Sequence, residues 1–150
     1  MTFKQRIHEK YSQIVNDRID VFRDMISNLT EDSKNDAKGS AGDKHETALS
    51  MMHIEQEKLT YKLREALDHK AILDKIAVHE SVSERIVLGS LVKANSNHLY
   101  ISAALPKITV DDVTVIALSP QSPLGEKLLG REVGYSFEIN NTKYTVAEIL

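Results

Sequence analysis

The sequence predicts an α+β protein in which an antiparallel α-helical coiled-coil hairpin precedes a small antiparallel β-sheet with one short helix. Apolar residues recur at helical spacing up to residue 76, and apolar and polar residues alternate in short runs after residue 85. Charge divides the chain similarly, since residues 1–76 hold 27 charged side chains, residues 77–150 hold 14, and all three prolines follow residue 100. We therefore expect a helical domain at 1–76, a linker at 77–85 and a second domain at 86–150.

The helical half contains two apolar stripes, one on each side of a glycine-bearing segment. The first steps by three or four residues: Ile7, Tyr11, Val15, Ile19, Phe22, Ile26 and Leu29. The second recurs every seven residues at Met52, Leu59, Ala66 and Leu73, and is widened by Leu63 and Leu67. Such stripes are typical of helices with coiled-coil character. They are also compatible with dimerisation, but Gly39-Ser40-Ala41-Gly42 interrupts the pattern where a chain reversal is needed, which favours a monomeric hairpin.

The segment from Thr30 to Ala41 is polar and mixed in charge, so we expect a frayed end or part of a loop there. Beyond residue 85 the expected strands are 86–92, 99–104, 113–118, 135–139 and 143–149. Asn95-Ser96-Asn97 and Asn140-Asn141 predict turns, and Asp111-Asp112 predicts a turn before the third strand. Ser122 and Pro123 predict the start of a short helix that runs through Leu129 and stops at Gly130.

Composition narrows the range of functions. The net charge of −3 and the pI near 6.1 argue against nonspecific binding to a nucleic-acid backbone, which requires a basic surface. Cysteine is absent, so disulfides, thiolate nucleophiles and Cys-ligated zinc are excluded. No apolar run approaches the length of a membrane span, and the N-terminus has no apolar signal core. We expect a cytoplasmic protein without a membrane partner.

Two acids, Asp43 and Glu46, stand three residues apart just after Gly42. Acids at this spacing near a helix start lie on one face and can point at one spot. At the tip of a helical hairpin they could carry a shared Mg²⁺ into another protein's active site, because Mg²⁺ prefers carboxylate oxygens and often takes only one or two. The same spacing also fits a capping box, with Asp43 as N-cap and Glu46 as its partner, and the two roles are compatible.

The sequence contains no motif of a complete active site. The six histidines are scattered and none forms a HExxH motif. His45 and His53 lie near Glu46 and Glu57, but we interpret them as exposed helix residues, because a closed metal site needs three or four convergent ligands. The serine elbow G-x-S-x-G and the phosphate-binding glycine loops are absent. We expect no enzyme activity of its own and no cofactor bound by the isolated chain.

Two stretches resemble the Gre family, the transcript-cleavage factors of bacterial RNA polymerase. Gly42-Asp43-Lys44-His45-Glu46-Thr47-Ala48 is similar to the family's Gly-Asp-x-x-Glu-Asn-Ala tip. The run from Ser122-Pro123-Leu124-Gly125 through Leu128-Leu129-Gly130 to Gly134 is similar to its Ser-Pro-x-Gly…Leu-Leu-Gly-x-x-x-Gly segment. Both occur in the family's order, and together with the helical half and the β-rich half the likeness covers nearly the whole chain.

The resemblance implies a fold and a function. The second domain would resemble the FK506-binding prolyl isomerases in fold and would dock at the mouth of the polymerase's secondary channel, with Ser122, Pro123, Leu124 and Gly125 as partner-binding residues. The hairpin would enter the channel. Asp43 and Glu46 would help to hold the second catalytic Mg²⁺ of the polymerase, which then cleaves backtracked RNA and frees a new 3′ end. The partners would be RNA polymerase and the nascent RNA inside it.

Other interpretations remain open because the tip differs from the family pattern. Thr47 stands in place of the usual Asn, Leu49 and Ser50 replace an acid and an aromatic residue, and Lys44 places a positive charge between the two acids. A polymerase-binding regulator of the same shape could therefore occupy the channel without cleavage. The heptad spacing alone also fits a third interpretation, a helical-hairpin adaptor unrelated to transcription. A prolyl isomerase is disfavoured, because the β-rich half has few aromatic residues for a ligand pocket.

Overall fold

The structure is a computed structural model that describes residues 1–37, 43–76 and 83–150, without the side chains of residues 33, 35–37 and 43–45. The chain is α+β, as predicted. It divides into two compact units. The helical unit comprises Gln13–Lys70, and the sheet unit combines Met1–Ser12 with Ala71–Leu150.

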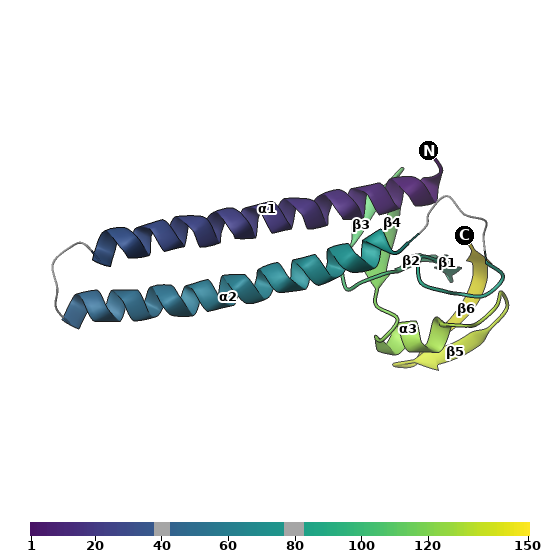
Figure 1. The fold of residues 1–150 in the computed structure, drawn as a ribbon. Coiled ribbons are helices and arrows are strands. Elements are labelled where there is room, and N and C mark those ends of the chain that lie inside the picture. The colour runs from purple at the N-terminus through teal and green to yellow at the C-terminus, as the bar shows by residue number, and fades with distance from the viewer. Residues whose placement is uncertain (38–42, 77–82) are drawn as a thin grey trace. The chain divides into compact units, whose positions relative to one another are not determined.

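The helical unit contains most of two long helices, α1 (Phe3–Ala37) and α2 (Asp43–Asp74), which lie side by side and pack against each other (Figure 1). Thr2 caps α1, because its hydroxyl accepts from the Gln5 backbone N–H at 3.1 Å and the Gln5 side chain accepts from the Thr2 N–H at 2.9 Å. The prediction of a frayed end or loop from Thr30 is wrong over its first part, since α1 continues to Ala37. Residues Lys38–Ala41 of that prediction lie outside the described residues.

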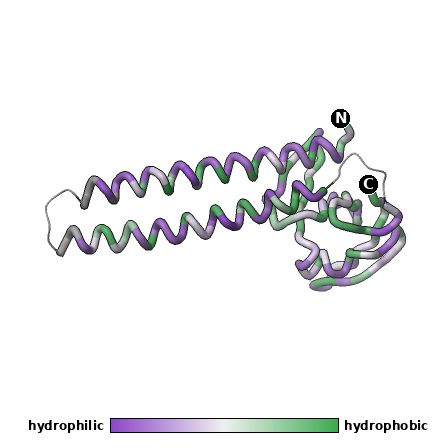
Figure 2. The backbone as a smooth tube through the Cα atoms, viewed as in Figure 1, coloured by the Kyte–Doolittle hydropathy of each residue, from purple (hydrophilic) through white to green (hydrophobic). Residues whose placement is uncertain are grey.

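Apolar residues recur among hydrophilic positions along both helices, as Figure 2 shows. Val15 and Ile19 of α1 and Leu59 and Ala66 of α2 are buried. Leu67 departs from the prediction, since its side chain is 37% exposed and does not widen the buried stripe. Within the described part of the chain, no helix is long and apolar enough to cross a lipid bilayer.

The sheet unit is built on a six-stranded sheet with the strand order β3-β4-β2-β1-β6-β5. The strands are β1 (Leu91–Ala94), β2 (Asn97–Ile101), β3 (Ile108–Val110), β4 (Val113–Leu118), β5 (Ser136–Ile139) and β6 (Thr142–Ile149). The prediction of an antiparallel sheet is wrong at one place, because β2 and β4 are parallel and the sheet is mixed. The connection from β2 leads first to β3, which returns against β4 and leaves β4 parallel to β2.

The strand predicted at 86–92 begins later than expected. Gly89 has a φ of +91°, and the Ser90 N–H donates to the carbonyl of Val87 at 3.0 Å, so a turn precedes β1. The three-residue strand β3 was not predicted. It joins β4 through Asp111 and Asp112, which both adopt positive φ values and form the turn that the sequence predicted.

The β5–β6 hairpin and the short helix α3 (Pro123–Leu128) confirm the sequence prediction. Asn140 and Asn141 both have positive φ, as a tight two-residue hairpin turn requires. Ser122 is the N-cap of α3, with Pro123 at its first position, and Gly130 at φ +81° follows its end. The core beside the sheet collects the buried side chains of Ile86, Val92, Ala94, Leu99, Ile101, Leu118, Leu128 and Val146.

The first three turns of α1 belong to the sheet unit and dock on β2, β3 and β4. Tyr11 and Tyr100 stack at a centroid distance of 6.1 Å with an interplanar angle of 13°. The Tyr11 hydroxyl donates to the carbonyl of Pro106 at 2.8 Å. At the edge of this contact the Arg6 guanidinium pairs with Asp111 in the β3–β4 turn. The left-handed turn at Asp111 thus places a carboxylate that anchors α1 to the sheet.

Candidate functional site

The acid pair singled out by the sequence stands at the start of α2. The helix begins at Asp43, so Glu46 lies in its first turn. The N-terminal turn of a helix leaves backbone N–H groups without helical partners and carries a partial positive charge, which favours carboxylates there. The Glu46 side chain is exposed. The side chains of Asp43, Lys44 and His45 lie outside the described residues, so the geometry of the pair stays a prediction.

Within the described residues, no three His, Asp or Glu side chains come together as a group that could hold a metal ion. His53 and Glu57, which stand one turn apart on α2, are both exposed. Glu46 therefore has no described set of neighbouring ligands, and any ion held there would need ligands from Asp43 or from another molecule.

The second predicted site, Ser122 to Gly125, forms the start of α3. The Ser122 hydroxyl donates to the Ser119 carbonyl at 2.7 Å and accepts from the Gly125 N–H at 3.0 Å. A Cβ atom at Gly125 would lie 2.1 Å from the Ser119 carbonyl oxygen, so only glycine fits this turn. Leu124 packs against the core, and Pro123 is exposed. Three of the four predicted partner-binding residues therefore have internal roles, and Pro123 faces solvent.

An apolar groove of ≈ 510 Å³ lies close to this motif within the sheet unit, and the sequence analysis missed it. Its lining includes Ile72, Val87, Leu88 and Leu129, with Pro120 at the segment that leads into α3. Val87 is 45% exposed, Leu88 37% and Leu129 44%. Clustered exposed apolar side chains are typical of interaction surfaces. The sequence signal for this surface is the pair of apolar residues directly before Gly89. The prediction of a strand at 86–92 places that pair inside the strand.

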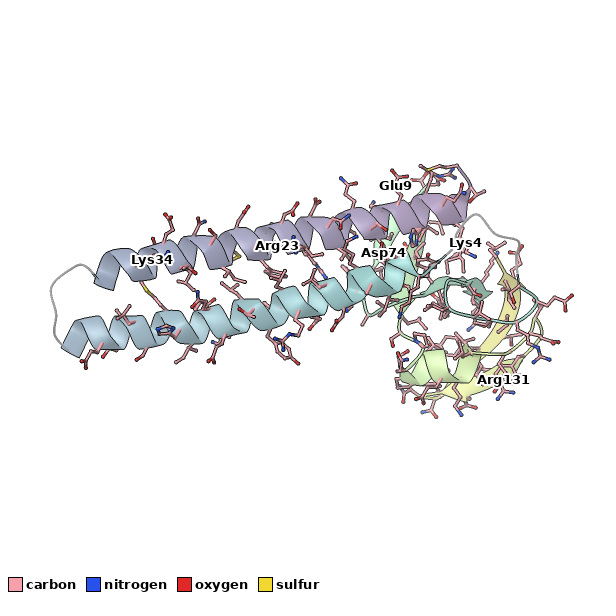
Figure 3. The ribbon with its side chains drawn as sticks, viewed as in Figure 1. Lys4, Glu9, Arg23, Lys34, Asp74 and Arg131 are labelled. Atoms are coloured by element: carbon pink, nitrogen blue, oxygen red, sulfur yellow. The ribbon has the colours of Figure 1, made fainter. Side chains whose placement is uncertain are left out.

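The groups with shifted pKa values lie at the docking site of α1 on the sheet. Burial raises the pKa of Tyr11 to about 12 and raises the pKa of Tyr100 further still. Burial also lowers the pKa of His8, although the nearby Asp74 carboxylate opposes this effect and the Lys4 ammonium adds to it. Figure 3 labels Lys4 and Asp74, which both belong to the sheet unit. These shifts follow from packing, which makes the cluster a structural anchor.

Comparison with known proteins adds no assignment. Searched against models of known protein families, the chain matches none, and no curated protein sequence matches it significantly.

Proposed function

We propose that this chain is a Gre-like transcription elongation factor that binds bacterial RNA polymerase through its secondary channel and stimulates Mg²⁺-dependent cleavage of backtracked RNA. The observation that carries the proposal is the start of α2 at Asp43, because the acids of the Gre-like tip then occupy the first turn of a long helix packed against another. The expected antiparallel hairpin is supported by Figure 1, in which the end of α1 and the start of α2 lie at the same end of the helix pair.

The proposed mechanism divides the chemistry between the two proteins. The polymerase would supply its catalytic centre and the RNA, and Asp43 and Glu46 would add carboxylate oxygens to its loosely held second Mg²⁺. A two-metal site stabilises both the attacking and the leaving oxygen of the phosphodiester, so better retention of one ion accelerates hydrolysis. The exposed carboxylate of Glu46 is available for such a contact. The chain would position charge without converting a substrate itself.

The sheet unit would dock at the channel mouth as a module with an FK506-binding-protein-like fold. The exposed Pro123 and the apolar groove lined by Val87, Leu88 and Leu129 are the surfaces that support this part of the proposal. An apolar groove with exposed aliphatic side chains gains free energy when a partner covers it, in proportion to the apolar area removed from water.

The test is an elongation complex of bacterial RNA polymerase that has been stalled and backtracked on a labelled transcript. The wild-type chain should shorten the RNA from its 3′ end in the presence of Mg²⁺. Asp43→Ala and Glu46→Ala should abolish the shortening, whereas Glu55→Ala, an exposed acid further along α2, should retain it. A transcript that stays intact with the wild-type chain would show that cleavage is the wrong function.

The second candidate function, a channel-binding regulator that does not cleave, is favoured by Leu49 and Ser50, which replace the acid and aromatic residue of the family tip. It predicts that the chain competes with a true cleavage factor for the polymerase and that Asp43→Ala leaves this competition unchanged. A pull-down that recovers no polymerase subunits would favour the helical-hairpin adaptor instead.

A further inference from the structure

Packing between the two helices weakens toward the end of α1 and the start of α2. Val15 and Ile19 are 1% and 4% exposed, and Ala66 and Leu59 are 2% and 4% exposed. Nearer the acid pair, the equivalent positions Phe22, Ile26, Leu29 and Met52 are only partly buried. A groove of ≈ 390 Å³ opens there, lined mainly by α2 residues with Ile26 of α1. Apolar contact alone therefore holds this part of the helix pair loosely.

A hydrogen bond crosses between the helices at this weakly packed part. The Gln56 side-chain amide donates to the Thr30 hydroxyl oxygen at 2.6 Å, and the Thr30 hydroxyl donates to the Ile26 carbonyl at 2.9 Å. Both side chains are partly buried. The Thr30 hydroxyl thus donates a hydrogen bond within α1 and accepts one from α2, and the two bonds together fix its orientation.

We propose that Thr30 and Gln56 form a positioning clasp that holds the start of α2, and with it Asp43 and Glu46, at a defined place beside α1. A polar pair between two helices specifies their alignment more than it adds stability, because its geometry is directional and that of apolar contact is not. Gln56 lies ten residues after Glu46 on the same helix, at about 1.5 Å per residue. A small tilt of α2 at Gln56 therefore becomes a larger displacement at the acid pair.

The clasp can be tested in the free chain, without any assumption about its partner. The protein has no cysteine, so spin labels at Asn28→Cys and Lys58→Cys report on the helix pair near the clasp, and labels at Asn16→Cys and Asp68→Cys report on its well-packed part. All four positions are exposed. We expect Thr30→Val to broaden the 28–58 distance distribution and to leave the 16–68 distribution unchanged.

Thr60→Val is the matched control. The Thr60 hydroxyl donates to the Gln56 carbonyl within α2 at 2.8 Å, so this change removes a hydroxyl from the same helix pair without breaking the bond between the helices. Thr60→Val should leave both distributions unchanged, and Thr30→Ser, which keeps the hydroxyl, should behave as the wild type. Identical distributions in Thr30→Val and wild type would overturn the proposal, as would equal broadening at both label pairs.

The consequence for activity rests on the proposed function. In the stalled-complex assay, Thr30→Val should lower the maximal cleavage rate about fivefold, the factor expected for one lost hydrogen bond. The concentration of the Thr30→Val protein that gives half-maximal cleavage should equal that of the wild type, because the substitution leaves the proposed polymerase-docking surface unchanged. If the wild-type chain does not stimulate cleavage, the proposed function fails, and the label distances still decide whether the clasp exists.

Discussion

The Nδ1 atom of His8 lies 2.7 Å from the phenolic oxygen of Tyr100, which joins the first turns of α1 to strand β2. Because burial raises the pKa of Tyr100, this phenol keeps its proton, and the tautomer of the His8 ring sets which of the two groups donates. The His8 ring also packs edge-on against the Tyr100 ring at a centroid distance of 6.2 Å. Burial of the ring lowers the pKa of His8, so this anchor of α1 on the sheet favours the uncharged histidine.

This arrangement makes the stability of the fold depend on pH. The pKa of His8 is lowered in the folded chain from the ordinary value of 6.5, so between these two values the unfolded chain binds the proton and the folded chain does not. Stability from this group is complete above pH 6.5 and is lost as the pH falls through the lowered folded pKa. We expect the denaturant concentration at the unfolding midpoint to decrease when the pH is lowered from 7.5 to 5. His8→Gln should make this dependence on pH less steep.

The control for the histidine prediction is His53→Gln, which changes an exposed histidine on α2. This variant should keep the wild-type dependence of the midpoint on pH. An unaltered slope in His8→Gln would show that acid acts on the fold through other groups.

The Tyr11 hydroxyl should contribute a measurable hydrogen bond to the same anchor. Tyr11→Phe keeps the ring that stacks on Tyr100 and leaves the Pro106 carbonyl without this donor, so we expect a loss of ~1 kcal/mol in the free energy of unfolding. Tyr11→Ala also removes a fully buried ring and should cost about 3–5 kcal/mol. Urea denaturation distinguishes the two, and equal losses would mean that the ring contributes nothing.

Gly125 should tolerate no side chain. In Gly125→Ala the new methyl group would meet the Ser119 backbone carbonyl, which cannot move without disrupting the turn before α3, so we expect a loss of at least ~2 kcal/mol. Gly134→Ala is the comparison, because Gly134 has a φ of +97° and no atom within 4 Å of the added carbon. It should cost only about 1–2 kcal/mol of backbone strain. A milder effect at Gly125 than at Gly134 would contradict the steric argument.

Two leucines on α2 should differ sharply in their contribution to stability. Leu59→Ala removes a side chain that is 4% exposed and should cost about 2–5 kcal/mol in the free energy of unfolding. Leu67→Ala removes one that is 37% exposed and should cost under ~1 kcal/mol. Thermal denaturation of both variants measures the difference. Similar losses would mean that Leu67 is buried in solution, as part of the widened apolar stripe that the sequence predicts.

If the apolar groove docks the polymerase, a charge in it should weaken binding. Val87→Glu places a carboxylate among aliphatic side chains and should raise the dissociation constant at least ~10-fold, because a partner would have to bury that charge. Val133→Glu is the matched control, since Val133 is 58% exposed and lies outside the lining of this groove. Equal binding by both variants would place the docking surface elsewhere.

Local signals in the sequence predicted those parts of the fold whose cause is local. Ser122 and Pro123 can start α3, and Asn140 and Asn141 can form the β5–β6 turn, with no help from distant residues. The sequence could not predict β3, because three residues carry too little periodicity and the strand exists only by pairing with β4. Gly89 is a local signal of a break in the strand predicted at 86–92, but the start of β1 at Leu91 depends on pairing with the distant strand β6.

The sequence by itself determined the α+β class, the two apolar helix stripes and the position of Asp43 and Glu46 at the start of the second helix, because period, capping and turn chemistry act over a few residues. Tertiary structure alone decided that Tyr11 stacks on Tyr100, that Arg6 meets Asp111 and that Gln56 reaches Thr30. These partners are far apart in the chain, and only the packing of whole elements brings them within contact distance.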